Sequence, residues 1–168
     1  NMESNHKSLL DVGCGLGDLY KLLSDHSITC EYTGVDILRE MVEEAQRRYP
    51  DVNFVHGDVF SQTLFSYLAF DIVYCSGVFN FNLGNNKKFI RRAFARFNVL
   101  SADKIIVNML HERAQNKEAE YFYYDPEETA KLAESFTWKV DVIDDYLHND
   151  FTLICEKKDV SLKENLLS

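Results

Sequence analysis

The amino-acid sequence predicts an α/β protein in which a mostly parallel sheet carries helices on both faces. Short apolar runs alternate with amphipathic segments from residue 8 to residue 158, the pattern of strands connected by crossover helices. The run FDIVYCSG at residues 70–77 is apolar almost throughout, as expected of a strand covered on both faces. The 168 residues contain no linker or internal repeat, so we expect one domain over residues 1–168 with its core at 8–158.

Leucine and proline positions define the elements of the first half. Leu19, Leu22 and Leu23 recur at helical spacing after the first apolar run, and Pro50 ends the next amphipathic segment. The sequence therefore predicts strands over residues 8–12, 30–37 and 52–58, with helices over residues 17–26 and 38–49.

The second half continues this alternation and ends in a hairpin. Asp125 and Pro126 are typical of the N-cap and the first turn of a helix. A short polar turn around residues 148–150 separates the last two apolar runs, which implies an antiparallel pair. The predicted strands span residues 70–77, 104–110, 138–144 and 151–158, the predicted helices span residues 86–100 and 125–136, and a frayed tail follows from Asp159.

Composition and charge argue against several classes of protein. The formal net charge is −9, so nucleic acid is not expected as a partner. The basic segment NNKKFIRRAFAR at residues 85–96 has its charges at helical spacing, which favours a solvated helix face over a binding patch. No apolar run reaches the roughly 20 residues that span a bilayer, and the N-terminus does not resemble a signal peptide. We therefore expect a cytoplasmic protein without a membrane partner.

The four cysteines are scattered along the chain and form no C-x-x-C pair. No cluster of His, Cys, Asp and Glu has the spacing of metal ligands. We expect reduced core thiols and no metal.

The first apolar run is followed by a loop with three alternate glycines, Gly13, Gly15 and Gly17. Glycine lets a backbone bend tightly or approach a ligand closely, although a tight turn without a ligand is the alternative. The dinucleotide-binding fingerprint needs a third glycine at the position that Asp18 occupies. A carboxylate there would repel a pyrophosphate at the helix N-terminus. The loop therefore favours a ligand without phosphates, and one that carries positive charge.

Two further carboxylates follow neighbouring strands. Asp36 ends the second strand, about 20 residues after the loop, where a carboxylate can accept hydrogen bonds from both ribose hydroxyls. It can also cap the next helix, and the two roles are compatible. Asp58 ends the third strand and could accept from the exocyclic amine of a nucleobase, or it could belong to a simple turn.

The stretches LLDVGCGLGDL, YTGVDILREMV, VNFVHGDVF and FDIVYCSGVFNF, in this order, resemble the motifs of the class I S-adenosylmethionine-dependent methyltransferases. The resemblance covers residues 8–158. More narrowly, CSGVFNF, YYDPEE and DDYLHNDFTLICEKK are similar to a group of small bacterial methyltransferases of unassigned substrate. The resemblance implies a Rossmann-like, seven-stranded, mostly parallel sheet of order 3-2-1-4-5-7-6 with an antiparallel last strand.

The resemblance also implies roles for single positions, with S-adenosylmethionine as the cofactor and S-adenosylhomocysteine as its product. The glycine loop and Asp11 would hold the methionine part, and Asp36 would bind the ribose. Asp58 and the Val59 backbone would read the adenine edge. The implied cofactor residues are Asp11, Gly13, Cys14, Gly15, Gly17, Asp36, Ile37, Met41, Asp58, Val59, Cys75, Ser76 and Gly77.

Candidate acceptor residues follow the fourth and fifth strands. Asn80 could orient an acceptor by hydrogen bonds, and His111 is the candidate general base because histidine titrates near neutrality. An ordinary loop histidine is the alternative for His111. Aromatic residues that could contact the substrate, or simply pack in the core, are Phe79, Phe81, Tyr123 and Tyr124.

The sequence thus predicts a methyltransferase that acts on an oxygen or nitrogen of a small molecule. The resemblance implies helices before the first strand, whereas seven residues precede Ser8. We therefore expect the N-terminal cap helices to be missing. Either the chain is incomplete, or the site is open, or a partner covers it. The alternative function is a non-catalytic S-adenosylmethionine-binding module or subunit, and Asp18 disfavours a nucleotide-dependent oxidoreductase. The sequence leaves open the acceptor and the oligomeric state.

Overall fold

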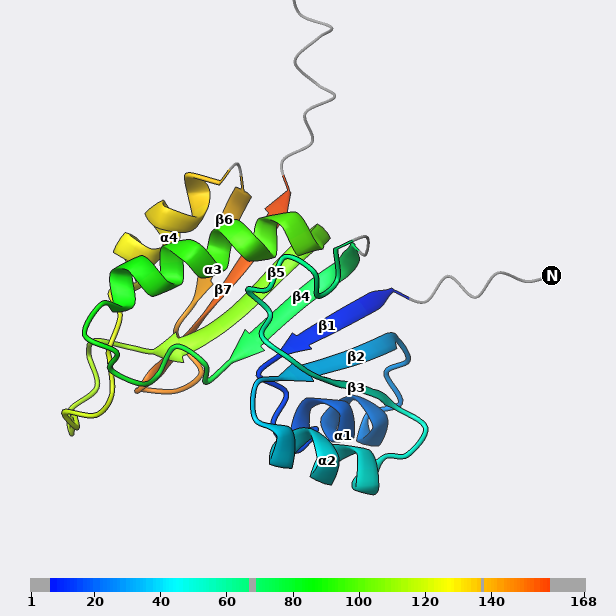
Figure 1. Ribbon diagram of the computed structural model, residues 1–168. Coiled ribbons are helices and arrows are strands. Elements are labelled where there is room, and N and C mark those ends of the chain that lie inside the picture. The colour runs from blue at the N-terminus through cyan, green and yellow to red at the C-terminus, as the bar shows by residue number, and fades with distance from the viewer. Residues whose placement is uncertain (1–6, 67–68, 137, 158–168) are drawn as a thin grey trace, which may run out of the picture.

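The computed structural model describes residues 7–66, 69–136 and 138–157, and over these ranges the chain forms one sheet with helices on both of its faces (Figure 1). The expected tail from Asp159 lies outside the described residues. The strands are β1 (Ser8–Val12), β2 (Glu31–Asp36), β3 (Asn53–His56), β4 (Phe70–Ser76), β5 (Ser101–Leu110), β6 (Trp138–Ile143) and β7 (Asp150–Lys157). The helices are α1 (Asp18–Asp25), α2 (Arg39–Arg48), α3 (Asn86–Leu100) and α4 (Pro126–Glu134).

The strand order is β3-β2-β1-β4-β5-β7-β6, which confirms the predicted sheet. Strands β3, β2, β1, β4 and β5 run parallel to one another, and β7 runs antiparallel to both β5 and β6. Strand β5 begins at Ser101, earlier than the predicted Lys104, because Ser101 pairs with Phe70 across a register irregularity. The predicted elements are otherwise displaced by only one or two residues at their ends.

Two layers of helix cover different halves of the sheet (Figure 1). Helices α1 and α2 lie beside β1, β2 and β3, whereas α3 and α4 lie over the half that contains β4 to β7. Successive residues of β1 belong to different cores: Leu9 packs in the cluster with Val42 of α2, and Leu10 packs in the larger cluster with Phe94 of α3. Because side chains alternate along a strand, the two helical layers lie on opposite faces.

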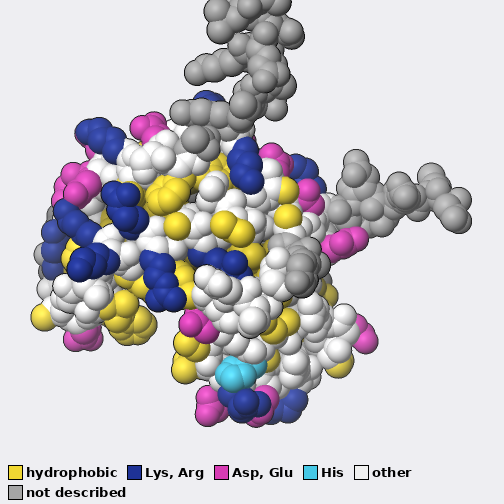
Figure 2. All heavy atoms as spheres, turned by 45° about the horizontal axis from the view of Figure 1, so that its top comes forward, with side chains coloured by type: hydrophobic (Ala, Val, Ile, Leu, Met, Phe, Trp, Pro, Cys, Tyr) yellow, Lys and Arg dark blue, Asp and Glu magenta, His cyan; other side chains and the backbone are white. Residues whose placement is uncertain are grey.

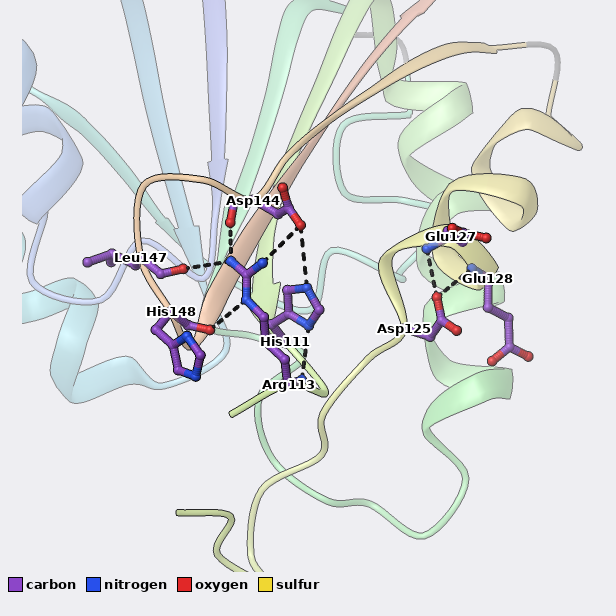
Figure 3. Close-up of polar contacts among 8 residues, drawn as sticks. All are labelled: His111, Arg113, Asp125, Glu127, Glu128, Asp144, Leu147 and His148. Atoms are coloured by element: carbon purple, nitrogen blue, oxygen red, sulfur yellow. Dashed lines mark hydrogen bonds and ion pairs between the residues drawn. The ribbon is translucent and has the colours of Figure 1, made fainter. Parts of the chain in front are cut away.

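Helix α4 shows how a local signal sets an element. The Asp125 carboxylate accepts hydrogen bonds from the N–H groups of Glu127 at 2.7 Å and of Glu128 at 3.1 Å (Figure 3). Pro126 occupies the first turn, where its missing N–H costs nothing. The predicted N-cap is therefore confirmed.

The carboxyl ends of the parallel strands meet at one edge of the sheet, and the loops there carry the charged and glycine-rich segments found in the sequence. In α/β sheets, ligands bind at such an edge, near the point where the strand order reverses. That reversal falls between β1 and β4. Across the helices that the structure describes, none is both long and apolar enough to span a membrane.

Candidate active site

The glycine loop after β1 has left-handed backbone at Gly13 and Gly15, with φ angles of 74° and 52°. The N–H groups of Gly13 and Cys14 donate to the Val35 carbonyl oxygen, at 2.8 and 3.1 Å, which fixes the loop against β2. A Cβ atom at Gly13 would lie 2.3 Å from Cγ2 of Val78, whereas one at Gly15 would meet nothing within 4 Å. Gly13 is therefore required by close packing, and Gly15 leaves open space above the loop.

Asp36 connects this loop to the second helix. Its Oδ2 accepts a hydrogen bond from the Gly15 N–H at 3.0 Å, and its Oδ1 accepts one from the Leu38 N–H at 2.9 Å. Leu38 is the N-cap residue of α2, so Asp36 holds the residue at the start of that helix, and no side-chain hydrogen bond caps the helix itself. Asp36 also lines the adjoining cavity, where its free lone pairs can accept from a ligand.

A cavity of about 460 Å³ lies beside the loop, within the range of roughly 300–1,000 Å³ that is usual for small-molecule sites. The described residues that line it include no Lys or Arg. Asp58 lies on its wall, and its side chain accepts from the Phe60 N–H at 2.8 Å. The lining residues are Val12, Gly13, Val35, Asp36, Ile37, Leu38, Gly57, Asp58, Val59, Phe60, Ser76, Gly77, Val78, Phe81 and Phe89.

Asp11 lies beneath the loop with 4% of its surface exposed. Its Oδ2 accepts a hydrogen bond from the Tyr32 hydroxyl at 2.6 Å. Burial raises the pKa of the Asp11 carboxyl to about 6, Tyr32 opposes this shift, and the carboxylates of Asp36 and Asp18 add to it. The carboxylates of Asp18 and Asp36 are thus close enough to act on the Asp11 carboxyl. Negative charge concentrated near the loop favours a cationic ligand.

The cavity contains only part of the predicted cofactor set. Gly13, Asp36, Ile37, Asp58, Val59, Ser76 and Gly77 line it, as does the predicted substrate residue Phe81. Asp11, Cys14, Gly15, Gly17, Met41 and Cys75 are not among the described lining residues. Cys75 is fully buried in the larger core.

His111 is brought to the end of β5 but not to this cavity (Figure 3). Its side chain is buried, its Nδ1 accepts from the Arg113 N–H at 3.1 Å, and its Nε2 lies 3.6 Å from Oδ2 of Asp144. Both ring nitrogens therefore face protein groups. This geometry fits a residue that fixes its neighbours better than a free general base.

Asn80, Phe79, Tyr123 and Tyr124 do not line the 460 Å³ cavity either. Phe79 and Tyr124 are core residues, exposed by 1% and 4%, and the Tyr124 hydroxyl donates to the Phe79 carbonyl oxygen. Tyr123 lines a second cavity, of about 540 Å³, between α3 and α4. The Asn80 side-chain oxygen is buried without a hydrogen-bond partner in the described structure. The core-packing alternative therefore describes Phe79 and Tyr124.

The basic segment of α3 forms a surface rather than part of the cavity. Lys and Arg side chains gather on the face that carries α3 and α4 (Figure 2). Lys87 pairs with Glu128 at 2.6 Å, and Arg92 lies 4.3 Å above the Phe60 ring. Arg96 donates to three carbonyl oxygens in the loop from Val59 to Leu64. Internal contacts thus occupy these cations, as a structural helix face requires.

Arg113, Asp144 and Tyr146 are functional candidates that sequence reasoning missed. Arg113 follows β5 directly, and Asp144 and Tyr146 reach the same place because the β6–β7 hairpin folds back to it. The polar turn before β7 indicated a hairpin without indicating what its tip contacts. Among the described residues, no group of three or more His, Cys, Asp or Glu side chains could hold a metal ion.

Comparison with known proteins agrees with this architecture. The model of the methyltransferase domain family matches residues 9–100. A demethylmenaquinone methyltransferase of Thermotoga maritima is 37% identical over 57 residues, which are 34% of this chain and 25% of that protein. A malonyl-[acyl-carrier protein] O-methyltransferase of Anoxybacillus flavithermus is 33% identical over 75 residues, 44% of this chain and 28% of that protein. The match therefore spans only about a quarter of each curated relative.

The fold is also that of solved methyltransferases. The crystal structure of magnesium protoporphyrin IX methyltransferase from Synechocystis PCC 6803, with bound S-adenosylmethionine, superposes with a TM-score of 0.70 at 16% identity. The superposition covers 91% of this chain and 71% of that chain. Since the family model covers more than half of the sequence, the chain belongs to the methyltransferase domain family, within the class I S-adenosylmethionine-dependent methyltransferases.

Proposed function

We propose that the 460 Å³ cavity binds S-adenosylmethionine and that the protein transfers its methyl group to an oxygen or nitrogen of a small molecule. The observation that carries this proposal is the charge of the site. The carboxylates of Asp36 and Asp58 line the cavity, and no described lining residue is cationic. A ligand with an ammonium and a sulfonium suits this environment, and a dinucleotide with its pyrophosphate does not.

The residues present fit such a cofactor. Cβ atoms at Gly15 or Gly77 would point into space that is free within 4 Å, so both positions leave room for a ligand against the backbone. Asp36 would accept from the ribose hydroxyls with the lone pairs not used by Gly15 and Leu38. Ile37 is 65% exposed at the cavity edge and offers an apolar surface to a purine ring.

When bound, the cofactor would supply a methyl group that is already activated by its sulfonium. An acceptor atom that takes this methyl group would release one proton to water. The protein's part is to align the two reactants, which can lower the barrier by roughly 7–11 kcal/mol. The glycine loop and Asp36 fix one partner, and the end of the sheet at Ser76 borders the space for the other.

Calorimetry tests the proposal. S-adenosylmethionine and S-adenosylhomocysteine are expected to bind with one-to-one stoichiometry, and NAD at the same concentration is expected to give no heat of binding. Tight NAD binding, or no heat with either sulfur ligand, would refute the proposal. A matched control is Asp51→Ala, which removes an exposed carboxylate from the turn before β3 and is expected to leave both affinities unchanged.

A further inference from the structure

A row of neutral polar side chains crosses the sheet beside the cavity. Ser76 of β4 stands opposite Asn108 of β5, and Asn108 stands opposite Thr152 of β7. The Ser76 hydroxyl donates to the Asn108 side-chain oxygen at 3.3 Å, and the Asn108 amide approaches Thr152 Oγ1 at 3.4 Å. Ser76 also lines the 460 Å³ cavity, so the row begins where that cavity ends.

Tyr146, from the loop between β6 and β7, completes this row. The Asn108 side-chain amide donates to the Tyr146 hydroxyl at 2.8 Å, and that hydroxyl lies 2.8 Å from Thr152 Oγ1. Tyr146 is 44% exposed, so its hydroxyl is held from one side while the ring remains accessible from the other. The four residues Ser76, Asn108, Tyr146 and Thr152 are called the hydroxyl–amide row below.

A single arginine holds the loop that carries Tyr146 (Figure 3). The Arg113 guanidinium donates to the carbonyl oxygens of Asp144, Leu147 and His148, which lie on both sides of Tyr146 in the chain. It also donates to the Asp144 carboxylate at 3.1 Å. A planar guanidinium group is suited to donating to several acceptors at once because its five N–H groups have fixed directions.

His111 anchors the base of this arrangement. Its backbone N–H donates to the Asn149 carbonyl oxygen at 2.7 Å, and its ring accepts from the Arg113 N–H. The ring also packs edge-on against Phe151, with 5.5 Å between centroids. The end of β5 therefore fixes the loop at residues 144–149 through several bonds, and Tyr146 has a defined place.

We propose that the hydroxyl–amide row is the subsite for the methyl acceptor, that it takes a neutral hydroxyl-bearing compound, and that Arg113 is its positioning residue. This inference rests on the proposed function. The row offers hydroxyl and amide groups and no charged side chain, so it can exchange hydrogen bonds with a hydroxyl without desolvating an ion. A carboxylate, phosphate or ammonium would find no opposite charge among the four residues.

Three probes with the same ring test the class of ligand: phenol, benzoate and benzylamine. Each is titrated by NMR into the full chain loaded with S-adenosylhomocysteine. Phenol is expected to bind about tenfold more tightly than benzoate or benzylamine, because only the ionic probes lose hydration without a charged partner. Tighter binding of either ionic probe overturns the subsite, as does a failure of all three to bind a chain that binds the cofactor product. A chain that does not bind the product at all instead refutes the proposed function.

Variants test the residues. Tyr146→Phe is expected to weaken phenol binding about fivefold, the effect of one lost neutral hydrogen bond, without changing the affinity for S-adenosylhomocysteine. Tyr20→Phe, which removes a hydroxyl from α1, is the matched control and is expected to change neither. Arg113→Ala is expected to weaken phenol binding and to broaden the backbone NMR signals of residues 144–149, and Arg113→Lys to restore both in part. Sharp loop signals with normal phenol affinity in Arg113→Ala would overturn the positioning role.

Discussion

The glycine-loop region and the hairpin region of this protein are built in different ways. The glycine-loop region comprises residues 11–17 and 36–38, and its contacts involve backbone groups of residues that follow neighbouring strands. The hairpin region comprises residues 108–113 and 144–152. Its contacts join the Arg113 side chain to backbone carbonyl oxygens about 35 residues further along the chain. The first region needs only the pairing of β1 with β2, and the second needs the antiparallel return of the β6–β7 hairpin. We therefore expect substitutions in the two regions to affect different ligands.

The largest expected effect follows Gly13→Ala. The new Cβ atom would lie 2.3 Å from Val78 Cγ2 at a φ of +74°, so the loop has to move. We expect a loss of at least about 2 kcal/mol in the free energy of unfolding and a loss of S-adenosylhomocysteine affinity of about 100-fold. Urea denaturation and calorimetry measure the two quantities. Gly84→Ala is the control, because it has a φ of +75° with no atom within 4 Å and is expected to keep its affinity.

Asp11→Asn tests the buried acid of the same region. The folded-state pKa of about 6 lies above the unfolded value near 3.8, so the native state binds more protons and stability falls as the pH rises from about 4 to about 6. Above pH 6 the penalty is constant, at about 3 kcal/mol for a shift of this size. We expect the variant to be more stable at pH 7 by up to this amount and to bind S-adenosylmethionine more weakly.

Urea denaturation at several pH values between 4 and 8 compares Asp11→Asn with the parent chain. Their stabilities are expected to converge near pH 4, where the parent carboxyl is protonated in both states. A constant difference over the whole pH range would contradict the assignment of the raised pKa to Asp11.

Asp36→Ala tests the carboxylate that lines the cavity, and its effect on ligands is expected on the cofactor and not on phenol. Removing hydrogen bonds to a carboxylate costs about 1.5–3 kcal/mol, so we expect the affinity for S-adenosylhomocysteine to fall about 10- to 150-fold. Phenol binding to the product-loaded chain is expected to be unchanged at saturating S-adenosylhomocysteine. An unaltered affinity for S-adenosylhomocysteine in calorimetry would remove Asp36 from the site.

The smallest effect is expected for His111→Ala, and it belongs to the hairpin region. The variant loses the contact with Phe151 and the hydrogen bond from the Arg113 N–H, so the free energy of unfolding is expected to fall by about 1–2 kcal/mol. Cofactor affinity is expected to stay the same. A measured loss of cofactor affinity would show that the two regions are coupled more strongly than their contacts indicate.

The contrast also explains what could be predicted from the sequence. Strand alternation, the Asp125 cap and the carboxylates after β2 and β3 are local signals, and the structure has them where they were expected. The argument against a dinucleotide used only Asp18, which is the first residue of α1. In contrast, the distance between His111 and Asp144 depends on the antiparallel return of β7, which periodicity does not locate in space.

Side-chain direction is the second quantity that the sequence did not supply. Cys75 and Ser76 are adjacent in β4, where side chains alternate between faces: Cys75 is fully buried in the core, and Ser76 is only partly buried. Phe79 and Phe81, in the segment after β4, also differ in burial: the first is exposed by 1% and the second by 61%. The sequence can thus indicate which aromatic residues lie near a site, but it does not show whether each side chain faces the core or the solvent.

The Arg113 guanidinium donates to three carbonyl oxygens of one loop, and this has a consequence for dynamics. The bonds from Arg113 share one side chain, so a rotation of that side chain releases all of them together (Figure 3). The carbonyl oxygens of Asp144, Leu147 and His148 would then be released to solvent in one step, while the strand pairing of β5 stays intact.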